Sequence, residues 1–241
     1  MALAHDYAQF AARLTELLGL SVPPMAITFW RDDDCPVERY AASMPEPTED
    51  GRTGAVAAGC VFWMKGPETT FSTVEADHGN CSVGSATHGF KQLNEVAGNA
   101  DVQALVESEW VTFEAMAGVA TVKDKPKHII YGPLSETPVD PDVVFLRINA
   151  KQAMILNDSL PDLRFEGKPQ CHIVAIAKQA KQPAVSTGCM LSRVRTGMSN
   201  NEMTCALPVQ DLPGLIGRIS AGAGADRKVA AYASDDSQRF R

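Results

Sequence analysis

Apolar residues occur along this chain in two patterns, and each pattern predicts a different kind of element. Residues 5–18 repeat apolar side chains with helical spacing and end at Gly19, a residue that suits a helix C-cap. Met25–Trp30 and Val143–Ile148 are short apolar runs of the kind found in buried strands. Further strands are predicted at 69–74, 128–131 and 202–208, and further helices at 55–64, 101–118, 150–157, 171–181 and 211–219. This order predicts an α/β or α+β fold.

A cysteine pattern occurs twice within this order of elements. Cys60 is followed by Cys81, which opens Cys-Ser-Val-Gly-Ser-Ala-Thr-His-Gly-Phe, and Cys171 is followed by Cys189, which opens Cys-Met-Leu-Ser-Arg-Val-Arg-Thr-Gly-Met. The offsets between the two copies nearly agree, because 171 − 60 is 111 and 189 − 81 is 108. A period of this length is too long for a solenoid repeat and fits the duplication of a half-domain.

We therefore predict one domain over residues 1–220, built from two pseudo-symmetric halves. The halves cover about 1–138 and 139–220, with Pro138–Pro141 as the linker between them. Residues 221–241 are predicted to form a C-terminal tail with some disorder. Packing of the halves about a pseudo-twofold axis would bring the four cysteines of the repeat close together.

The composition limits the classes of function. The chain has 241 residues, a formal net charge of −7 and no marked basic patch, which argues against nucleic-acid binding. No apolar run reaches the roughly 18 residues of a membrane span, and the first residues lack the pattern of a signal peptide, so we expect a cytoplasmic protein without a membrane partner. In that compartment cysteines are more often metal ligands, catalytic thiols or buried residues than disulfides.

The cysteine segments resemble the family called domain of unknown function 169. The resemblance covers about residues 16–220, and its most specific part is Ser186-Thr-Gly-Cys189-Met-Leu-Ser-Arg193. The chain departs from the family pattern at Ser82-Val83, where Pro-Gly is expected, and at Trp63-Met64, where smaller residues are usual. The resemblance implies cysteine-centred function without naming a reaction. The other matching stretches are 18–20, 24–29, Cys60 with 65–66, Cys81 with Gly84 and 89–90, Cys171, 197–198, 202–203 and Pro208.

Four cysteines are enough for a metal centre. Cys60, Cys81 and Cys189 are the predicted ligands of a [4Fe–4S] cluster, with Cys171 as the fourth ligand or a neighbour, and zinc is the alternative metal. Such a centre would act in redox or small-molecule chemistry, which includes sulfur chemistry. The spacing is not diagnostic, because the chain has no Cys-x-x-Cys.

Two readings without a metal stay open. One is a small-molecule binding or sensing module whose pocket lies between the halves, and the other is an enzyme with Cys189 as nucleophile. The candidate catalytic residues are Arg193, which would bind an anionic group of the ligand, His88, which would transfer protons, and Glu202, a candidate ion-pair partner of Arg193. A homo-oligomer is also left open.

Overall fold

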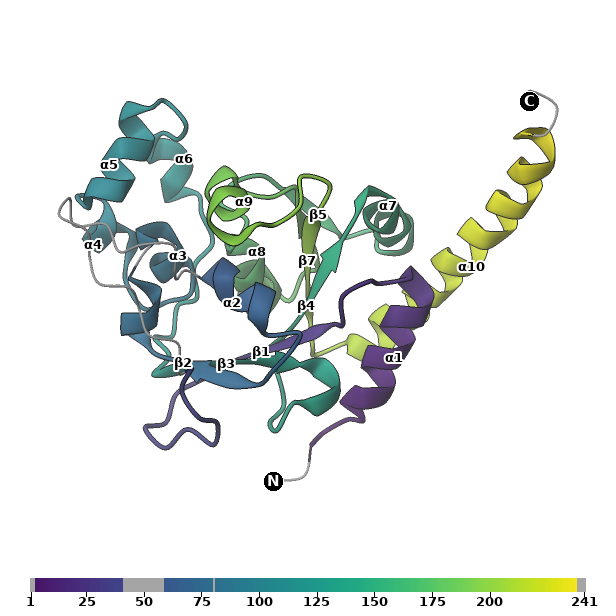
Figure 1. The fold of residues 1–241 in the computed structure, drawn as a ribbon, viewed down its shortest axis with the longest axis horizontal. Helices are drawn as coiled ribbons and strands as arrows, with labels where there is room; N and C mark the ends of the chain where they lie inside the picture. Colours follow the sequence, from purple (N-terminus) through teal and green to yellow (C-terminus); the bar gives the residue numbers. More distant parts are fainter. Residues whose placement is uncertain (1–2, 41–58, 80, 238–241) are drawn as a thin grey trace.

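The computed structural model describes residues 3–40, 59–79 and 81–237 and shows a mixed α/β fold (Figure 1). Its strands are β1 (Met25–Trp30), β2 (Phe71–Thr73), β3 (His128–Pro133), β4 (Val143–Ile148), β5 (Arg164–Glu166), β6 (Ala184–Ser186) and β7 (Met203–Pro208). Its α-helices are α1 (Tyr7–Leu18), α2 (Gly59–Lys65), α3 (Ser82–Thr87), α4 (Leu93–Val96), α5 (Ala100–Glu107), α6 (Phe113–Ala117), α7 (Ala150–Ser159), α8 (His172–Ala175), α9 (Met190–Thr196) and α10 (Leu212–Ser237). Short 3₁₀ helices η1 (Glu75–His78) and η2 (Leu134–Glu136) and a π-helix η3 (Ile176–Ala180) complete the order.

One sheet organises the described residues, with its strands in the order β2-β3-β1-β4-β7-β6-β5. All neighbouring strands are antiparallel except β5 and β6, which run parallel. Both faces of the central strands are buried, because side chains of β4 alternate between two hydrophobic cores. Val144 and Leu146 pack with α1, α7 and α10, whereas Val143 and Phe145 pack with α2 and α8 on the other face.

The two sides of the central pair β1–β4 have the same pairing register. The first residues of these strands, Met25 and Val143, pair with the prolines that end β3 and β7, Pro133 and Pro208. The first residue of β2 pairs with Tyr131, two positions before Pro133. In the same way, the first residue of β6 pairs with Ala206, two positions before Pro208. The cysteine segments follow this order, since α2 precedes β2, α8 precedes β6, and α3 and α9 follow these two strands.

Local sequence signals account for the ends of α1. The Asp6 side chain accepts a hydrogen bond from the Gln9 amide at 3.0 Å, and Gly19 takes a left-handed conformation with φ of 63° at the C-cap. Helix α1 lies beside α10, and the end of α10 extends away from the rest of the molecule (Figure 1). Helices α4, α5 and α6 lie together on the opposite side (Figure 1).

Several predicted elements differ from those observed. The helix predicted over 101–118 is divided into α5 and α6, and Glu109 between them has a positive φ of 58° that no α-helix accommodates. The helix predicted over 171–181 changes from α to π after Ala175. The predicted final helix, 211–219, continues to Ser237, so the region predicted as a flexible tail is helical over its described part. Residues 55–58 of the helix predicted over 55–64 lie outside the described residues.

Candidate functional site

The four cysteines of the repeat all sit at the amino-terminal ends of helices. Cys60 is the second residue of α2, and the N-cap residues of α3, α8 and α9 are Cys81, Cys171 and Cys189. Because these helices lie on the same face of the sheet, their four thiol-bearing ends line one pocket. These four pocket-lining residues are separated by up to 129 positions in the sequence, 189 − 60.

The pocket is small and apolar. Its cavity volume is about 50 Å³, which is room for a molecule of a few heavy atoms. A second part of the lining comes from α5, α6 and the segment between them, through Leu105, Trp110, Val111 and Met116. Within the described part of the chain, the lining contains no Asp, Glu, Lys, Arg or His side chain. Its polar side chains are those of Gln170, Ser192 and Trp110, together with the thiols.

The thiols of the pocket differ in environment. Burial raises the pKa of the Cys171 thiol well above its usual value, and the neighbouring Cys81 raises this pKa further, as do Cys189 and Cys60 to smaller extents. A hydrogen bond with Thr87 acts in the opposite direction but does not reverse the shift. Cys171 is therefore a neutral thiol at neutral pH. The sulfur of Cys81 accepts a hydrogen bond from the Gly84 amide at 3.3 Å. Cys60, Cys81 and Cys189 are partly exposed, whereas Cys171 is buried.

The predicted cysteine-ligated metal centre is wrong. Among residues 3–40, 59–79 and 81–237, no group of three His, Cys, Asp or Glu side chains is placed so that it could hold a metal ion. A ligating cysteine must also be a thiolate, and burial opposes ionisation of Cys171. This finding removes the support for Cys60, Cys81, Cys189 and Cys171 as ligands of iron–sulfur or zinc.

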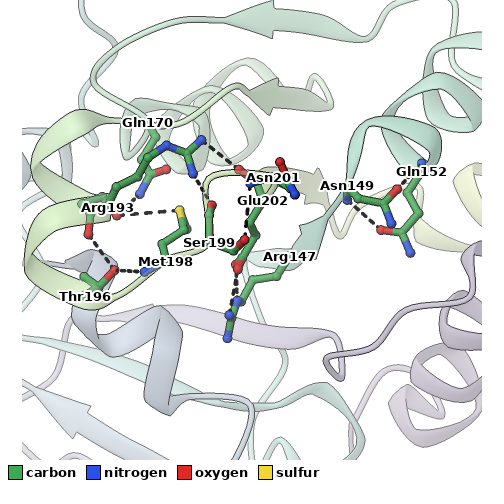
Figure 2. A network of polar contacts seen from close by, with 11 residues as sticks. Arg147, Asn149, Gln152, Gln170, Arg193, Thr196, Met198, Ser199, Asn201 and Glu202 are labelled. Atoms are coloured by element: carbon green, nitrogen blue, oxygen red, sulfur yellow. Dashed lines mark hydrogen bonds and ion pairs between the residues drawn. The ribbon is translucent and has the colours of Figure 1, made fainter.

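Arg193 and Glu202 do not form the expected ion pair with each other. The guanidinium of Arg193 donates to three backbone carbonyls. These are the carbonyls of Ser199 and of Glu202, the latter at 3.0 Å (Figure 2), and that of Thr187 at 2.7 Å. The Glu202 carboxylate instead pairs with Arg147 on β4, with one contact of 2.9 Å between Arg147 Nη2 and Glu202 Oε2 (Figure 2). Both residues therefore hold the segment between α9 and β7 in place. The role of Arg193 in binding an anion and the catalytic role of Glu202 stay predictions.

His88 lies behind the pocket and not in its lining. Its Nδ1–H donates to the Gly84 carbonyl at 2.8 Å, its Nε2 is buried without a hydrogen-bond partner, and its ring lies 5.6 Å from that of His78. Burial lowers the pKa of His88 to about 4. His88 is thus a neutral core residue at neutral pH, and its role in proton transfer stays a prediction.

Gln170 is a pocket residue that sequence reasoning missed. It lies directly before Cys171, its side chain is 1% exposed, and its amide Nε2 donates to the Ser192 hydroxyl at 2.6 Å (Figure 2). Its amide oxygen Oε1 is buried without a hydrogen-bond partner. The position of Gln170 within the cysteine repeat was the only available signal, because a single glutamine has no sequence pattern that marks it.

Comparison with known proteins gives one match. The family DUF169, described as uncharacterised ArCR, matches residues 13–218, which include every element from the middle of α1 to the first part of α10. No curated protein and no solved structure shows significant similarity to the chain. None of the described helices is both long and apolar enough to cross a membrane.

Proposed function

The chain belongs to the DUF169 family, and from its cysteine-lined pocket we propose that it is a protein that binds a small, neutral and largely apolar molecule. The observation that carries this proposal is the pocket itself, in which all four repeat cysteines and a set of aliphatic and aromatic side chains surround about 50 Å³. Pockets for small ligands are typically apolar with a few polar groups that fix the orientation of the ligand.

The charge of the lining argues for a neutral ligand. Transfer of an ion from water into an apolar site is costly unless an opposite charge meets it, and no described lining residue carries a charge. Arg193, the residue expected to meet an anion, donates to backbone carbonyls and does not line the pocket. A neutral ligand therefore fits these walls better than the anionic ligand suggested by the sequence. The neutral thiol of Cys171 is polarisable and is a weak hydrogen-bond donor, which suits such a molecule.

The pocket also fits an origin by duplication of a half-domain. We infer the two halves from the shared register, in which β1, β3 and β2 correspond to β4, β7 and β6 about the central antiparallel pair. Under this correspondence α2 matches α8 and α3 matches α9, so each half contributes two cysteines to the pocket. A ligand would then lie between two related walls.

Binding of xenon followed by methyl NMR tests whether the pocket accepts an apolar guest. Dissolved xenon should shift the methyl signals of Leu105, Met116 and Leu191 in a saturable manner, because their side chains line the pocket. Methyl groups of Leu14 and Leu215 serve as internal references, since they lie in the core on the other face of the sheet.

A pair of matched variants assigns the response to the pocket. Val111→Phe places a larger side chain at a lining position and should abolish the saturable shifts. Val194→Phe makes the same change on the surface, where Val194 is 78% exposed, and should leave them unaltered. Pocket methyl groups that do not respond to xenon, or that respond equally in Val111→Phe, would contradict the proposal.

A further inference from the structure

The amide of Gln170 belongs to a buried chain of hydrogen bonds. Ser192 Oγ donates to the sulfur of Met198 at 3.9 Å, and it accepts from Gln170 Nε2 at 2.6 Å (Figure 2). All three side chains are buried, with exposed fractions of 1% for Gln170, 2% for Ser192 and 3% for Met198.

In this arrangement one strong acceptor of a pocket-lining residue has no hydrogen-bond partner. Gln170 lines the pocket, and its Oε1 is buried without a hydrogen-bond partner. An amide oxygen in this state has lost its hydration without a compensating hydrogen bond. Buried polar groups in folded proteins are paired in the large majority of cases, so an exception in a ligand pocket points to the ligand.

We propose that Gln170 determines specificity in this pocket by accepting a hydrogen bond from an N–H or O–H group of the ligand. The inference rests on the proposed binding function and names its ligand class, a neutral molecule of a few heavy atoms that joins an apolar body to one hydrogen-bond donor. The apolar body packs against the side chains of α5 and α6, and the donor meets Gln170 beside Cys171.

Two probes of the same skeleton test the role of the donor. 2-Propanol and acetone each have three carbons and one oxygen, but only 2-propanol donates a hydrogen bond. Titrations followed by the pocket methyl signals should give an affinity for 2-propanol about tenfold higher than for acetone, the ratio that corresponds to about 1.4 kcal/mol. The side-chain carbonyl carbon of Gln170 should shift with 2-propanol and not with acetone.

Gln170→Leu keeps much of the volume of the side chain and removes the acceptor. In this variant the affinity for 2-propanol should fall to that for acetone, while the affinity for acetone should stay within about twofold. Gln182→Leu is the matched control, because the Gln182 amide donates to the Asp162 carbonyl and does not line the pocket. This control should keep the preference for 2-propanol.

A second pair of probes gives the same test without any variant. N-Methylacetamide carries an N–H that N,N-dimethylacetamide lacks, so the wild-type protein should prefer the first of these. Equal affinities within both pairs, or a preference that persists in Gln170→Leu, would overturn the role of Gln170 while xenon binding still supports the pocket. Failure of xenon and of all four probes to reach the pocket would overturn both proposals.

Discussion

The ammonium group of Lys178 lies 2.5 Å from the carboxylate of Asp142, and this contact joins η3 to the start of β4. The exposed fractions of the two side chains are 9% for Lys178 and 25% for Asp142. The second oxygen of Asp142 accepts a hydrogen bond from the Phe29 amide at 2.8 Å, and the ammonium also lies 5.0 Å from the centre of the Phe29 ring. The pair thus ties the helix that follows Cys171 to the central strands.

Loss of one member of this pair should destabilise the fold. Lys178→Met leaves the Asp142 carboxylate partly buried without its cation, and we expect the free energy of unfolding in urea to fall by about 3 kcal/mol. Lys127→Met provides the comparison, because Lys127 and Asp33 form an exposed pair with exposed fractions of 50% and 87%. That change should cost less than about 1 kcal/mol. Equal losses in the free energy of unfolding would show that burial does not make the Lys178–Asp142 pair contribute more than the exposed Lys127–Asp33 pair.

How far the sequence predicts this fold depends on burial and on sequence separation. Strands β1 and β4 follow from sequence because their apolar runs are buried on both faces. Strand β5 was missed because it is a three-residue edge strand in which Arg164 and Phe165 are exposed, so no apolar pattern marks it.

In the candidate site as well, the sequence marks local features but not contacts between distant residues. Cys81 and Cys189 are the N-cap residues of α3 and α9, and the sequence marks these positions by the small-residue turns around them. The partner of Glu202 was assigned to nearby Arg193, whereas the structure places Arg147, 55 residues away, beside the carboxylate. The sequence could not show this pairing because it depends on the register between β4 and β7.

The buried histidines should make stability depend on pH. Burial lowers the pKa of His88 to about 4, and burial together with neighbouring His88 lowers the pKa of His78 well below its usual value. Because the unfolded chain binds protons near pH 6.5 and the folded chain does not, the stabilising contribution is present above pH 6.5 and decreases as the pH falls from 6.5 toward 4. For His88 alone the loss is on the order of 3 kcal/mol.

His88→Leu should flatten this pH dependence. The free energy of unfolding, measured in urea from pH 8 to pH 4, should then decrease less steeply, by up to about 1.4 kcal/mol per pH unit. For each protein, the free energy of unfolding is compared with its own value at pH 8. Packing lost through the substitution is then not counted as a change in pH dependence. Parallel curves for the variant and the wild type would show that His88 does not titrate in this way.

Gly89 should not tolerate a side chain. Its φ is 83°, and a Cβ placed there would lie 2.6 Å from the Val122 carbonyl oxygen. Gly89→Ala should therefore cost about 2–3 kcal/mol in the free energy of unfolding through backbone strain and this contact. Gly98→Ala is the control, because a Cβ at Gly98 meets no atom within 4 Å. A tolerated Gly89→Ala would mean that the turn after α3 adjusts without loss.

The hydroxyl of Tyr131 should contribute little to stability although its ring is fully buried. The side chain is 0% exposed and its hydroxyl oxygen has no hydrogen-bond partner, so the folded state loses the hydration of this group without compensation. Burial raises the pKa of Tyr131, and the nearby thiols of Cys60 and Cys171 raise it further, which keeps the hydroxyl protonated. Tyr131→Phe removes the hydroxyl and keeps the ring, so the free energy of unfolding should stay the same or increase by about 1 kcal/mol.

Tyr7→Phe separates this effect from the general cost of removing a buried hydroxyl. Tyr7 is 2% exposed, and its hydroxyl donates to the Asp140 carboxylate at 3.0 Å. The same substitution there should destabilise the fold by about 1–2 kcal/mol, because a charge-assisted hydrogen bond is lost, while Asp140 Oδ1 keeps the Ala4 amide as a donor. A loss of similar size in Tyr131→Phe would mean that the Tyr131 hydroxyl has a partner in solution. Its electrostatic interaction with Cys60 and Cys171 would then place that partner next to the cysteine-lined pocket.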